Sequence, residues 1–343
     1  MNRGARTGAV AKKWLARAEK ELSRCGFYED DLVMIVEMNY TDMPEDWFKL
    51  SGLEVERLDD EEKLSRPQYE HKWLGSYLDT IDNSIIDPSW FDACVNAHKL
   101  PHLETAFTPH GAIFASHDLS GLGNDDKSTT IRHGSIIKSV QSKSTGDVDD
   151  GIDWATGIAN QYSADWFIWD GDGMGAGCKR QVSIAFEGTK TSYHMFRGSL
   201  SGSGQDNAGR VYMPLDDDKD TKPKKYAETF KNNRAQYYTM LANRCYNTYR
   251  CVVKGEYVDP DEMISFDTDG IENIAQLKTE LCRIPLKDNA SGLIQILSKK
   301  EMKALGIDSP NDADSVMMSM FAPQAKAKRP EVEEQPKARG FFR

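Results

Sequence analysis

Two segments of the chain share a pattern in which a buried strand ends at an aspartate and a glycine-rich turn follows. The first, GAIFASHDLSGLGNDDKS at 111 to 128, has an apolar run of strand length that ends at Asp118. The second, ADWFIWDGDGMGAG at 164 to 177, has an aromatic run that ends at Asp170, and four alternating glycines follow it. Each pattern predicts a strand within a sheet and a carboxylate at its end, beside backbone that a metal or a phosphate can approach closely.

Two familiar ligand-binding loops do not account for the second segment. In a calcium loop that starts at Asp170, the fifth and twelfth positions would carry oxygen ligands, but they hold Met174 and Gln181. The dinucleotide pattern G-x-G-x-x-G fails as well, since its last glycine falls on Ala176 or on Cys178. The pattern that remains is a strand, an aspartate and a tight glycine turn.

A third candidate acid lies in SPNDADSVMMSMF, residues 309 to 321. Ser309 and Pro310 indicate the start of a helix, and one face of that helix would carry Ala313, Val316, Met317 and Met320. Asp314 lies near this face, which we expect to pack on the sheet. Any one of the three aspartates has an ordinary alternative explanation, because Asp suits turns and helix N-termini. Together they supply the converging carboxylates that divalent metal ions require.

The ordered set HDLSGLGNDDKS, WFIWDGDGMGAG and SPNDADSVMMSM resembles the nuclease domain of tailed-phage terminase large subunits. FKNNRAQYY at 230 to 238 and GLIQILSKKEMKALGIDSPNDADS at 292 to 315 extend the resemblance. MNYTDMP at 38 to 44 and QYEHKWLGSY at 68 to 77 look like the end of that family's ATPase domain. The resemblance implies an α/β fold, with a ribonuclease H-like mixed sheet flanked by helices and preceded by a partial ATPase-like segment.

The resemblance also implies an activity and a site. The chain would be an endonuclease that cuts double-stranded phage DNA during genome packaging, in the cytoplasm of the infected bacterial host, with the terminase small subunit and the portal as partners. Asp118, Asp170 and Asp314 would be its catalytic, metal-binding acids. Asp118 would bridge two Mg²⁺ or Mn²⁺ ions, with Asp170 on one and Asp314 on the other. One ion would lower the pKa of an attacking water, and the other would stabilise the leaving oxygen.

Three further aspartates are weaker candidates for metal binding. Asp172 follows Asp170 by two residues, and Asp125 and Asp126 lie in the segment after Asp118. Simple solvation of a turn is the favoured explanation of each of them.

The net charge of the chain constrains how it can bind DNA. The formal net charge is −11, which argues against tight unaided DNA binding, because phosphate contacts supply most nonspecific affinity. Basic residues do gather locally, at the N-terminus, before the expected long helix and near Lys299. We expect the middle group to contact DNA, because it borders the glycine-rich segment 198 to 225, predicted to be a mobile surface loop. Its members are Lys222, Lys224, Lys225, Lys231 and Arg234, and the first three are the favoured DNA contacts.

The remaining features bound the organisation of the chain. We expect the ATPase-like portion and a connector over 1 to 105, the nuclease domain over 106 to 323, and a disordered tail over 324 to 343. Glu37 faintly imitates a Walker B acid, but no G-x-x-x-x-G-K-[ST] loop accompanies it, so we expect no ATPase activity from this chain alone. No apolar run approaches a membrane span or a secretory signal. The six cysteines form no C-x-x-C pair, which favours reduced thiols.

Hydrophobic patterning predicts the order of elements in the nuclease region. Between the candidate acids we expect strands at 128 to 133, 135 to 142, 182 to 186 and 292 to 297, and helices at 149 to 162, 226 to 250 and 271 to 282. Near the N-terminus we expect a helix at 9 to 24 and a strand at 32 to 39.

Two other classes of function stay open on these residues. A ribonuclease H-like resolvase or transposase would use similar acids on branched or end-specific DNA. A non-catalytic docking module of the packaging motor would use its helices to bind the portal or the small subunit. Metal-dependent nicking of DNA separates the docking module from both enzymes.

Overall fold

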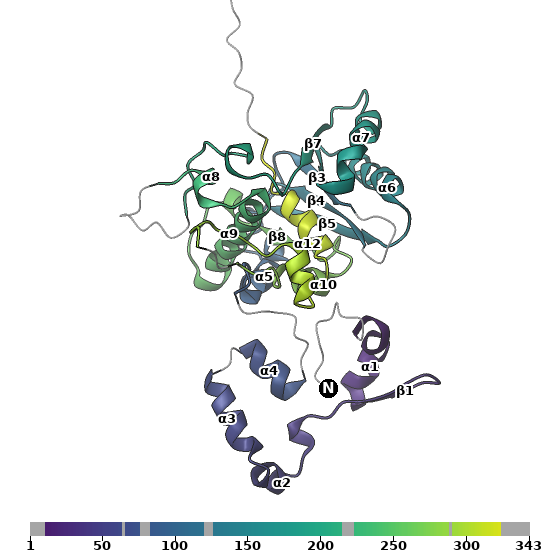
Figure 1. Ribbon diagram of the computed structural model, residues 1–343, viewed down its shortest axis with the longest axis vertical. Coiled ribbons are helices and arrows are strands. Elements are labelled where there is room, and N and C mark those ends of the chain that lie inside the picture. The colour runs from purple at the N-terminus through teal and green to yellow at the C-terminus, as the bar shows by residue number, and fades with distance from the viewer. Residues whose placement is uncertain are drawn as a thin grey trace, which may run out of the picture.

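The computed structural model describes residues 11–63, 66–75, 83–119, 126–214, 223–287 and 290–323. Its centre is a six-stranded mixed sheet in the order β7-β6-β3-β4-β5-β8 (Figure 1). The strands β3, β4 and β5 form an antiparallel meander, whereas β6 runs parallel to β3, β7 to β6 and β8 to β5. Their bounds are Ile113–Asp118, Lys127–His133, Ile136–Lys143, Trp166–Asp170, Ser192–Phe196 and Ser265–Phe266 for β3 to β8. The expected mixed α/β class is confirmed.

Helices cover both faces of this sheet (Figure 1). Successive side chains of a strand point to opposite faces, so that on β3 Phe114 joins one core cluster and Ala115 another. The Ala115 side packs on α6 (Val148–Gln161) and α7 (Lys179–Ala185). Five helices contribute to the core on the Phe114 side: α5 (Pro88–Cys94), α9 (Asn233–Lys254), α10 (Ile274–Leu281), α11 (Lys299–Ala304) and α12 (Asn311–Met318).

The pairing of β3 with β6 brings two of the candidate acids together. The parallel register pairs Ser116 with Ile168 and His117 with Trp169, so Asp118 and Asp170 are the next residues on two neighbouring strands. Both share the alternation of Phe114 and Ile168, whose side chains belong to the core on the α12 side. The sequence therefore places both carboxylates on the sheet face that α12 covers.

A tight turn follows Asp170, as the glycines predict. The indole Nε1–H of Trp169 donates to the carbonyl oxygen of Gly175 at 2.9 Å, which folds the 3₁₀ segment η4 (Gly173–Cys178) back against β6. A Cβ added to Gly175 would lie 1.7 Å from the carbonyl oxygen of Asp170. Only glycine fits at this close approach.

The strand expected at 182 to 186 is wrong, because these residues lie at the end of α7. The alternation of Val182, Ile184 and Phe186 predicted a strand, but Ile184 is 59% exposed. Val182 and Phe186, four residues apart, are the buried pair, and this spacing belongs to a helix. The run is too short for its sequence to distinguish the period of a strand from the period of a helix, and the buried pair shows that the helical period is the correct one.

Most of the other expected elements hold with shifted bounds. The helix expected at 226 to 250 is divided into α8 (Tyr226–Thr229) and α9, and the side chain of Asn232 caps α9 by accepting from the amide of Ala235 at 3.0 Å. The strand expected at 292 to 297 is wrong, because these residues make only isolated bridges, from Ile294 to Phe230 and from Ile296 to Leu286. The expected strands at 128 to 133 and 135 to 142 correspond to β4 and β5, and the helices at 149 to 162 and 271 to 282 to α6 and α10.

Residues 83 to 107, expected within a connector, contribute to the main body instead. Ile86, Phe91 and Cys94 are fully buried in the core with α9, and the rings of Phe91 and Phe266 stack with centroids 4.8 Å apart. This segment also holds the 3₁₀ turn η3 (Ala97–Lys99); the other short 3₁₀ turns of the main body are η5 (Gly202–Gly204) and η6 (Pro260–Glu262).

The N-terminal elements lie apart from the sheet in Figure 1 and have a small core of their own, made by Phe48, Tyr69 and Trp73. The expected helix appears as η1 and α1, and the expected strand is reduced to β2 in a two-stranded sheet. Their bounds are Ala11–Leu15 for η1, Ala16–Cys25 for α1, Phe27–Glu29 for β1, Met34–Val36 for β2, Tyr40–Asp42 for η2, Glu45–Leu50 for α2, Leu53–Lys63 for α3 and Arg66–Leu74 for α4.

Within the described ranges, no helix combines the length and the apolar character needed to cross a membrane. Lys222, Asp125 and the tail expected at 324 to 343 lie outside the described residues.

Candidate active site

Three elements bring Asp118, Asp170 and Asp314 to one cavity of about 290 Å³. Asp118 and Asp170 end the neighbouring strands β3 and β6, and Asp314 comes from the first turn of α12. Thus the three acids that the sequence singled out line the same space. The wall of the cavity also includes Asp172, Phe196, Gly198, Ser199, Asn232, Arg234, residues 295 to 299, Met317 and Met318.

Asp314 is surrounded by groups that favour its ionised form. Its Oδ1 accepts from the hydroxyl of Tyr238 at 2.7 Å and from Nε and Nη2 of Arg234, both at 3.2 Å. Its Oδ2 lies 2.9 Å from Nζ of Lys299. Burial alone would raise the pKa of Asp314, but Arg234 and Lys299 outweigh it and lower this pKa to about 2. Asp314 therefore stays ionised throughout the neutral range.

The surroundings of Asp118 and Asp170 instead favour the protonated form of each carboxyl group. Asp118 is only 1% exposed, and burial raises its pKa to about 8 although Lys299 partly offsets the effect; the carboxylates of Asp314 and Asp170 raise it further. Burial likewise raises the pKa of Asp170 to about 6, while the amide of Asp172, which donates to Asp170 Oδ1 at 2.9 Å, acts to lower it. Three neighbouring carboxyl groups with separated pKa values are typical of a functional site.

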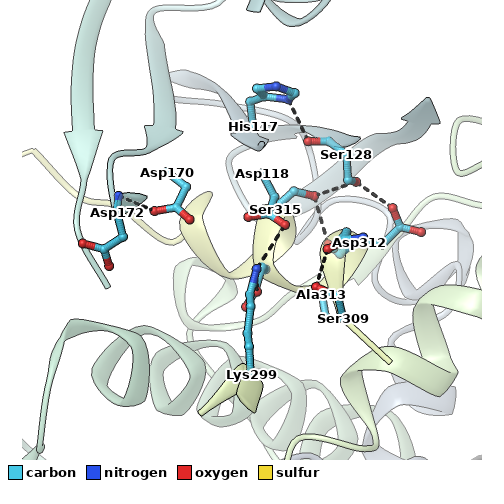
Figure 2. A network of polar contacts seen from close by, with 12 residues as sticks. His117, Asp118, Ser128, Asp170, Asp172, Lys299, Ser309, Asp312, Ala313 and Ser315 are labelled. Carbon is cyan, nitrogen blue, oxygen red and sulfur yellow. Dashed lines mark hydrogen bonds and ion pairs between the residues drawn. The ribbon is translucent and has the colours of Figure 1, made fainter. Parts of the chain in front are cut away.

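Lys299 supplies the positive charge nearest to these acids. It is the first residue of α11 (Lys299–Ala304), whose start is fixed by the side chain of Ser298 through a reciprocal cap with Glu301. Its Nζ lies 3.4 Å from Asp118 Oδ2 and 2.9 Å from Asp314 Oδ2, and Figure 2 shows the side chain extending toward Asp118. The ammonium group thus partly neutralises two carboxylates that would otherwise repel each other.

Asp172 has a different set of partners. Its Oδ2 accepts from the amide of Ser199 at 2.8 Å, and its Oδ1 accepts from the Ser199 hydroxyl at 2.8 Å. Asp172 lines the cavity, but in this arrangement both of its oxygens hold the segment after β7.

That segment was expected to be a mobile loop over 198 to 225, and for residues 198 to 214 the expectation is wrong. The side chain of Asn233 donates to the carbonyl of Arg197 at 3.0 Å and accepts from the amide of Asp206 at 2.9 Å. The hydroxyl of Tyr237 donates to Asp206 at 2.9 Å, and the amide of Arg234 donates to Gly198 at 3.0 Å. The composition of this segment predicted mobility. It could not reveal these anchors, because they come from α9, which lies outside the segment in the sequence.

The remaining candidates lie outside the cavity wall. Lys224 and Lys225 are exposed beside α8, and Asp126 is half-buried just before β4. Arg234, which the sequence placed in the basic group expected to contact DNA, contacts Asp314 instead, and so does Tyr238, which the sequence did not assign to the site. Their signal was present in the segment FKNNRAQYY, where positions four apart on a helix share one face.

Comparisons with known proteins agree with this geometry. The nuclease domain of the large terminase subunit of bacterial virus Sf6 is 41% identical to this chain, with a TM-score of 0.62, and the match covers 70% of this chain and 99% of that domain. The chain belongs to the large terminase subunit nuclease family. No family model and no curated protein sequence matches it.

Two further structures of the Sf6 terminase nuclease, both of mutant forms, contain metal ions. One contains manganese and is 40% identical, with a TM-score of 0.60; the other contains calcium and is 41% identical, with a TM-score of 0.61. Each match covers 70% of this chain and 100% of the other. Family membership also favours a terminase nuclease over a resolvase or a transposase.

The donor atoms of this terminase nuclease suit hard divalent cations, since they are carboxylate oxygens from three rigid elements. As the described side chains stand, no three histidine, cysteine or carboxylate groups are close enough to hold an ion together. The ammonium of Lys299 lies between Asp118 and Asp314. A cation that binds both acids would therefore compete with Lys299.

We expect Lys299→Ala to tighten the binding of Mn²⁺ roughly tenfold, a change of about 1.4 kcal/mol, because it removes a competing cation. Without metal, the same change should lower the melting temperature by several degrees, since two buried carboxylates lose their partner. Thermal melts over a range of Mn²⁺ concentrations measure both effects, with the exposed neighbour Lys300 changed to Ala as the control. Weaker Mn²⁺ binding in Lys299→Ala than in wild type would contradict competition.

Metal binding should also depend on pH. Because Asp118 and Asp170 must lose their protons to act as ligands, and their pKa values are raised to about 8 and about 6, binding should strengthen as pH rises through this window and level off above it. The measurement is the rise in melting temperature caused by Mg²⁺ at the two ends of the window. The Asp170→Asn, Asp314→Asn double variant is the control, and an equal rise in it would place the ion elsewhere.

Proposed function

We propose that this terminase nuclease is a metal-dependent endonuclease that cleaves double-stranded phage DNA during genome packaging. The observation that carries the proposal is the convergence of Asp118, Asp170 and Asp314 on one cavity, in a chain 41% identical to a terminase nuclease. Three carboxylates of this kind are what hydrolysis of a phosphodiester by paired Mg²⁺ or Mn²⁺ ions requires.

Asp118, Asp170 and Asp314 would hold the ions, with Asp118 between the other two. When bound, such ions activate a water molecule and neutralise charge on the phosphate. Arg234 and Tyr238 fix Asp314 by three hydrogen bonds to one oxygen, which leaves its Oδ2 directed at Lys299. No nucleophilic side chain is required in this proposal.

Asp172 would contribute mainly by holding Ser199 at the edge of the cavity rather than as a ligand. The two hydrogen bonds it accepts from Ser199 support this assignment. A metal that displaced Ser199 would make Asp172 a further ligand.

We propose that the N-terminal region is the end of an ATPase domain that lacks the phosphate-binding loop. On the β1 and β2 hairpin, Phe27, Met34, Val36 and Met38 are between 42% and 78% exposed. An isolated hairpin is marginally stable, and further strands of such a domain would cover this apolar face. The boundary expected at 105 is better placed near 82, because residues 85 to 107 pack into the nuclease core.

The partners follow from the same assignment. Double-stranded DNA would be the substrate, and the terminase small subunit and the portal would bring it to the nuclease in the cytoplasm of the infected host. Such tethering raises the local DNA concentration, which compensates for the net charge of −11. No ATPase activity is expected of this chain by itself.

We expect Asp118→Asn to reduce plasmid nicking in Mn²⁺ by roughly a thousandfold or more, about 4 kcal/mol of transition-state stabilisation, because it removes the central ligand. The fold should survive, since Asn has the same size and, like the protonated carboxyl that burial favours at Asp118, carries no charge. Nicking and a thermal melt are measured together, with the exposed Asp308→Asn variant as the control. Full activity in Asp118→Asn would remove Asp118 from the site.

The proposed DNA contact at Lys224 and Lys225 has its own test. Each lysine that pairs with a phosphate releases about one counterion. In the Lys224→Glu, Lys225→Glu variant, the negative slope of log affinity against log salt concentration should therefore become shallower by about 2. Nicking should weaken most at moderate salt, while metal binding stays unchanged. Lys179→Glu, Lys190→Glu is the matched control, with the same change of charge on exposed lysines at the start of α7 and just before β7. Equal salt dependence in the two variants would exclude this contact.

A further inference from the structure

Helix α12 rests on a patch of hydroxyl groups rather than on an apolar surface. Ser116 on β3 and Ser128 and Thr130 on β4 are fully buried, and the antiparallel register pairs Ser116 with Thr130 and Asp118 with Ser128. By alternation along the strands, these hydroxyls point to the same face as Asp118. The next strand adds Ser142, which pairs with Ser128.

Two residues of α12 bind this hydroxyl patch. Asp312 Oδ1 accepts from the hydroxyls of Ser128 and Ser142, both at 2.6 Å. The hydroxyl of Ser315 lies 2.6 Å from that of Thr130 and 3.1 Å from that of Ser128. Figure 2 shows Asp312 and Ser315 meeting Ser128 from the helix.

The patch also contacts the helix backbone. The hydroxyl of Ser116 donates to the carbonyl oxygen of Ser315 at 2.7 Å. On the side away from the sheet, Glu280 of α10 accepts from the amide of Ala313 at 3.0 Å. The first turn of α12 is therefore held from two directions, by the sheet and by α10.

The spacing of these contacts controls the direction of Asp314. Residues 312 and 315 lie three apart, close to one helical turn, so both face the sheet, and residue 314 between them is directed sideways into the cavity. Apolar packing has no preferred direction, whereas a hydrogen bond weakens steeply when its angle is distorted. The bonds of Asp312 and Ser315 thus resist rotation of α12 about its axis, which is the motion that would turn Asp314 away from Asp118.

We propose that Asp312 is a positioning residue, which sets the orientation of Asp314 by anchoring the first turn of α12 to the hydroxyls of Ser128 and Ser142. The inference rests on the proposed nuclease function and adds to it a residue that touches neither metal nor substrate. A displacement of about 1 Å at a reacting group can cost about a hundredfold in rate, so loss of this anchor should reach the chemistry although Asp312 takes no part in it.

The test uses the full chain and three variants. Asp312→Ala removes the acceptor, Asp312→Asn keeps an oxygen that can accept both hydroxyls, and the Ser128→Ala, Ser142→Ala double variant removes the donors without any change of charge. Asp308→Ala, at an exposed aspartate four residues earlier, is the matched control. Each protein is assayed for plasmid nicking at saturating Mn²⁺ and for melting temperature with and without Mn²⁺.

We expect Asp312→Ala to nick DNA about tenfold to a hundredfold more slowly at saturating Mn²⁺, and its Mn²⁺-induced rise in melting temperature should shrink. The serine double variant should show the same loss in weaker form, and Asp312→Asn should stay within a few-fold of wild type. If Asp312 had a purely structural role, Asp312→Ala would lower the melting temperature of the metal-free protein. Its nicking rate and its Mn²⁺-induced rise in melting temperature would both stay at the wild-type level.

Wild-type nicking in folded Asp312→Ala would overturn the proposal. If Asp312→Ala does not fold, the serine double variant decides, and unchanged nicking in it would be equally decisive against the anchor. A wild-type protein that neither nicks DNA nor responds to Mn²⁺ would overturn the nuclease function itself, and the inference with it. When the wild type is active, the result for Asp312→Ala tests only the positioning role and leaves the nuclease function itself unaffected.

Discussion

Two buried carboxyl groups, Asp118 and Asp314, share one cavity with the half-buried Asp170, and the free-energy cost of their charges is the constraint around which this part of the molecule is arranged. Like charges at short range in a poorly solvated cavity raise one another's free energy strongly. The compensation is uneven: Asp314 has Arg234, Tyr238 and Lys299 as partners, whereas for Asp118 and Asp170 burial outweighs the nearby positive charge and, with a smaller contribution from neighbouring carboxylates, raises their pKa values to about 8 and about 6. Asp314 thus stays ionised throughout the neutral range, whereas Asp118 and Asp170 keep their protons to higher pH.

This asymmetry gives Lys299 a double role in the metal-free protein. Its ammonium stabilises a site that would otherwise tend to open, and it also occupies space between Asp118 and Asp314. The side chain is 43% exposed, so a flexible stem could carry the ammonium out toward solvent once another cation compensated for the charge of the two acids. A more enclosed arginine in its place would be harder to displace, as the pairing of Arg234, whose side chain is only 14% exposed, with Asp314 illustrates. Lysine therefore suits a position where one cation is exchanged for another.

The sequence predicted the acids better than their surroundings. Asp118 and Asp170 could be located because an apolar run, an acid and glycines are adjacent in the chain, and Asp314 because a helix start precedes it. Lys299 appeared only as one of several basic residues, although the spacing of Ser298 and Glu301 is that of a capping box and marks the start of its helix. The anchors of residues 198 to 214 could not be predicted, since Asn233 and Tyr237 reach that segment only after the chain has folded.

The hydroxyl patch beneath α12 explains how such a site can exist before metal binds. If the three acids were held in place only by a shared ion, folding of the α12 region would wait for that ion, and part of the binding free energy would be spent on ordering the helix. Here Ser128, Thr130 and Ser142 fix α12 through bonds that involve no metal ligand. Small hydroxyl residues also let the helix approach the sheet closely, where larger apolar side chains would hold it away. The direction of Asp314 is then a property of the fold, and the free energy of the proposed metal binding would remain available to displace Lys299 and to remove the proton from Asp118.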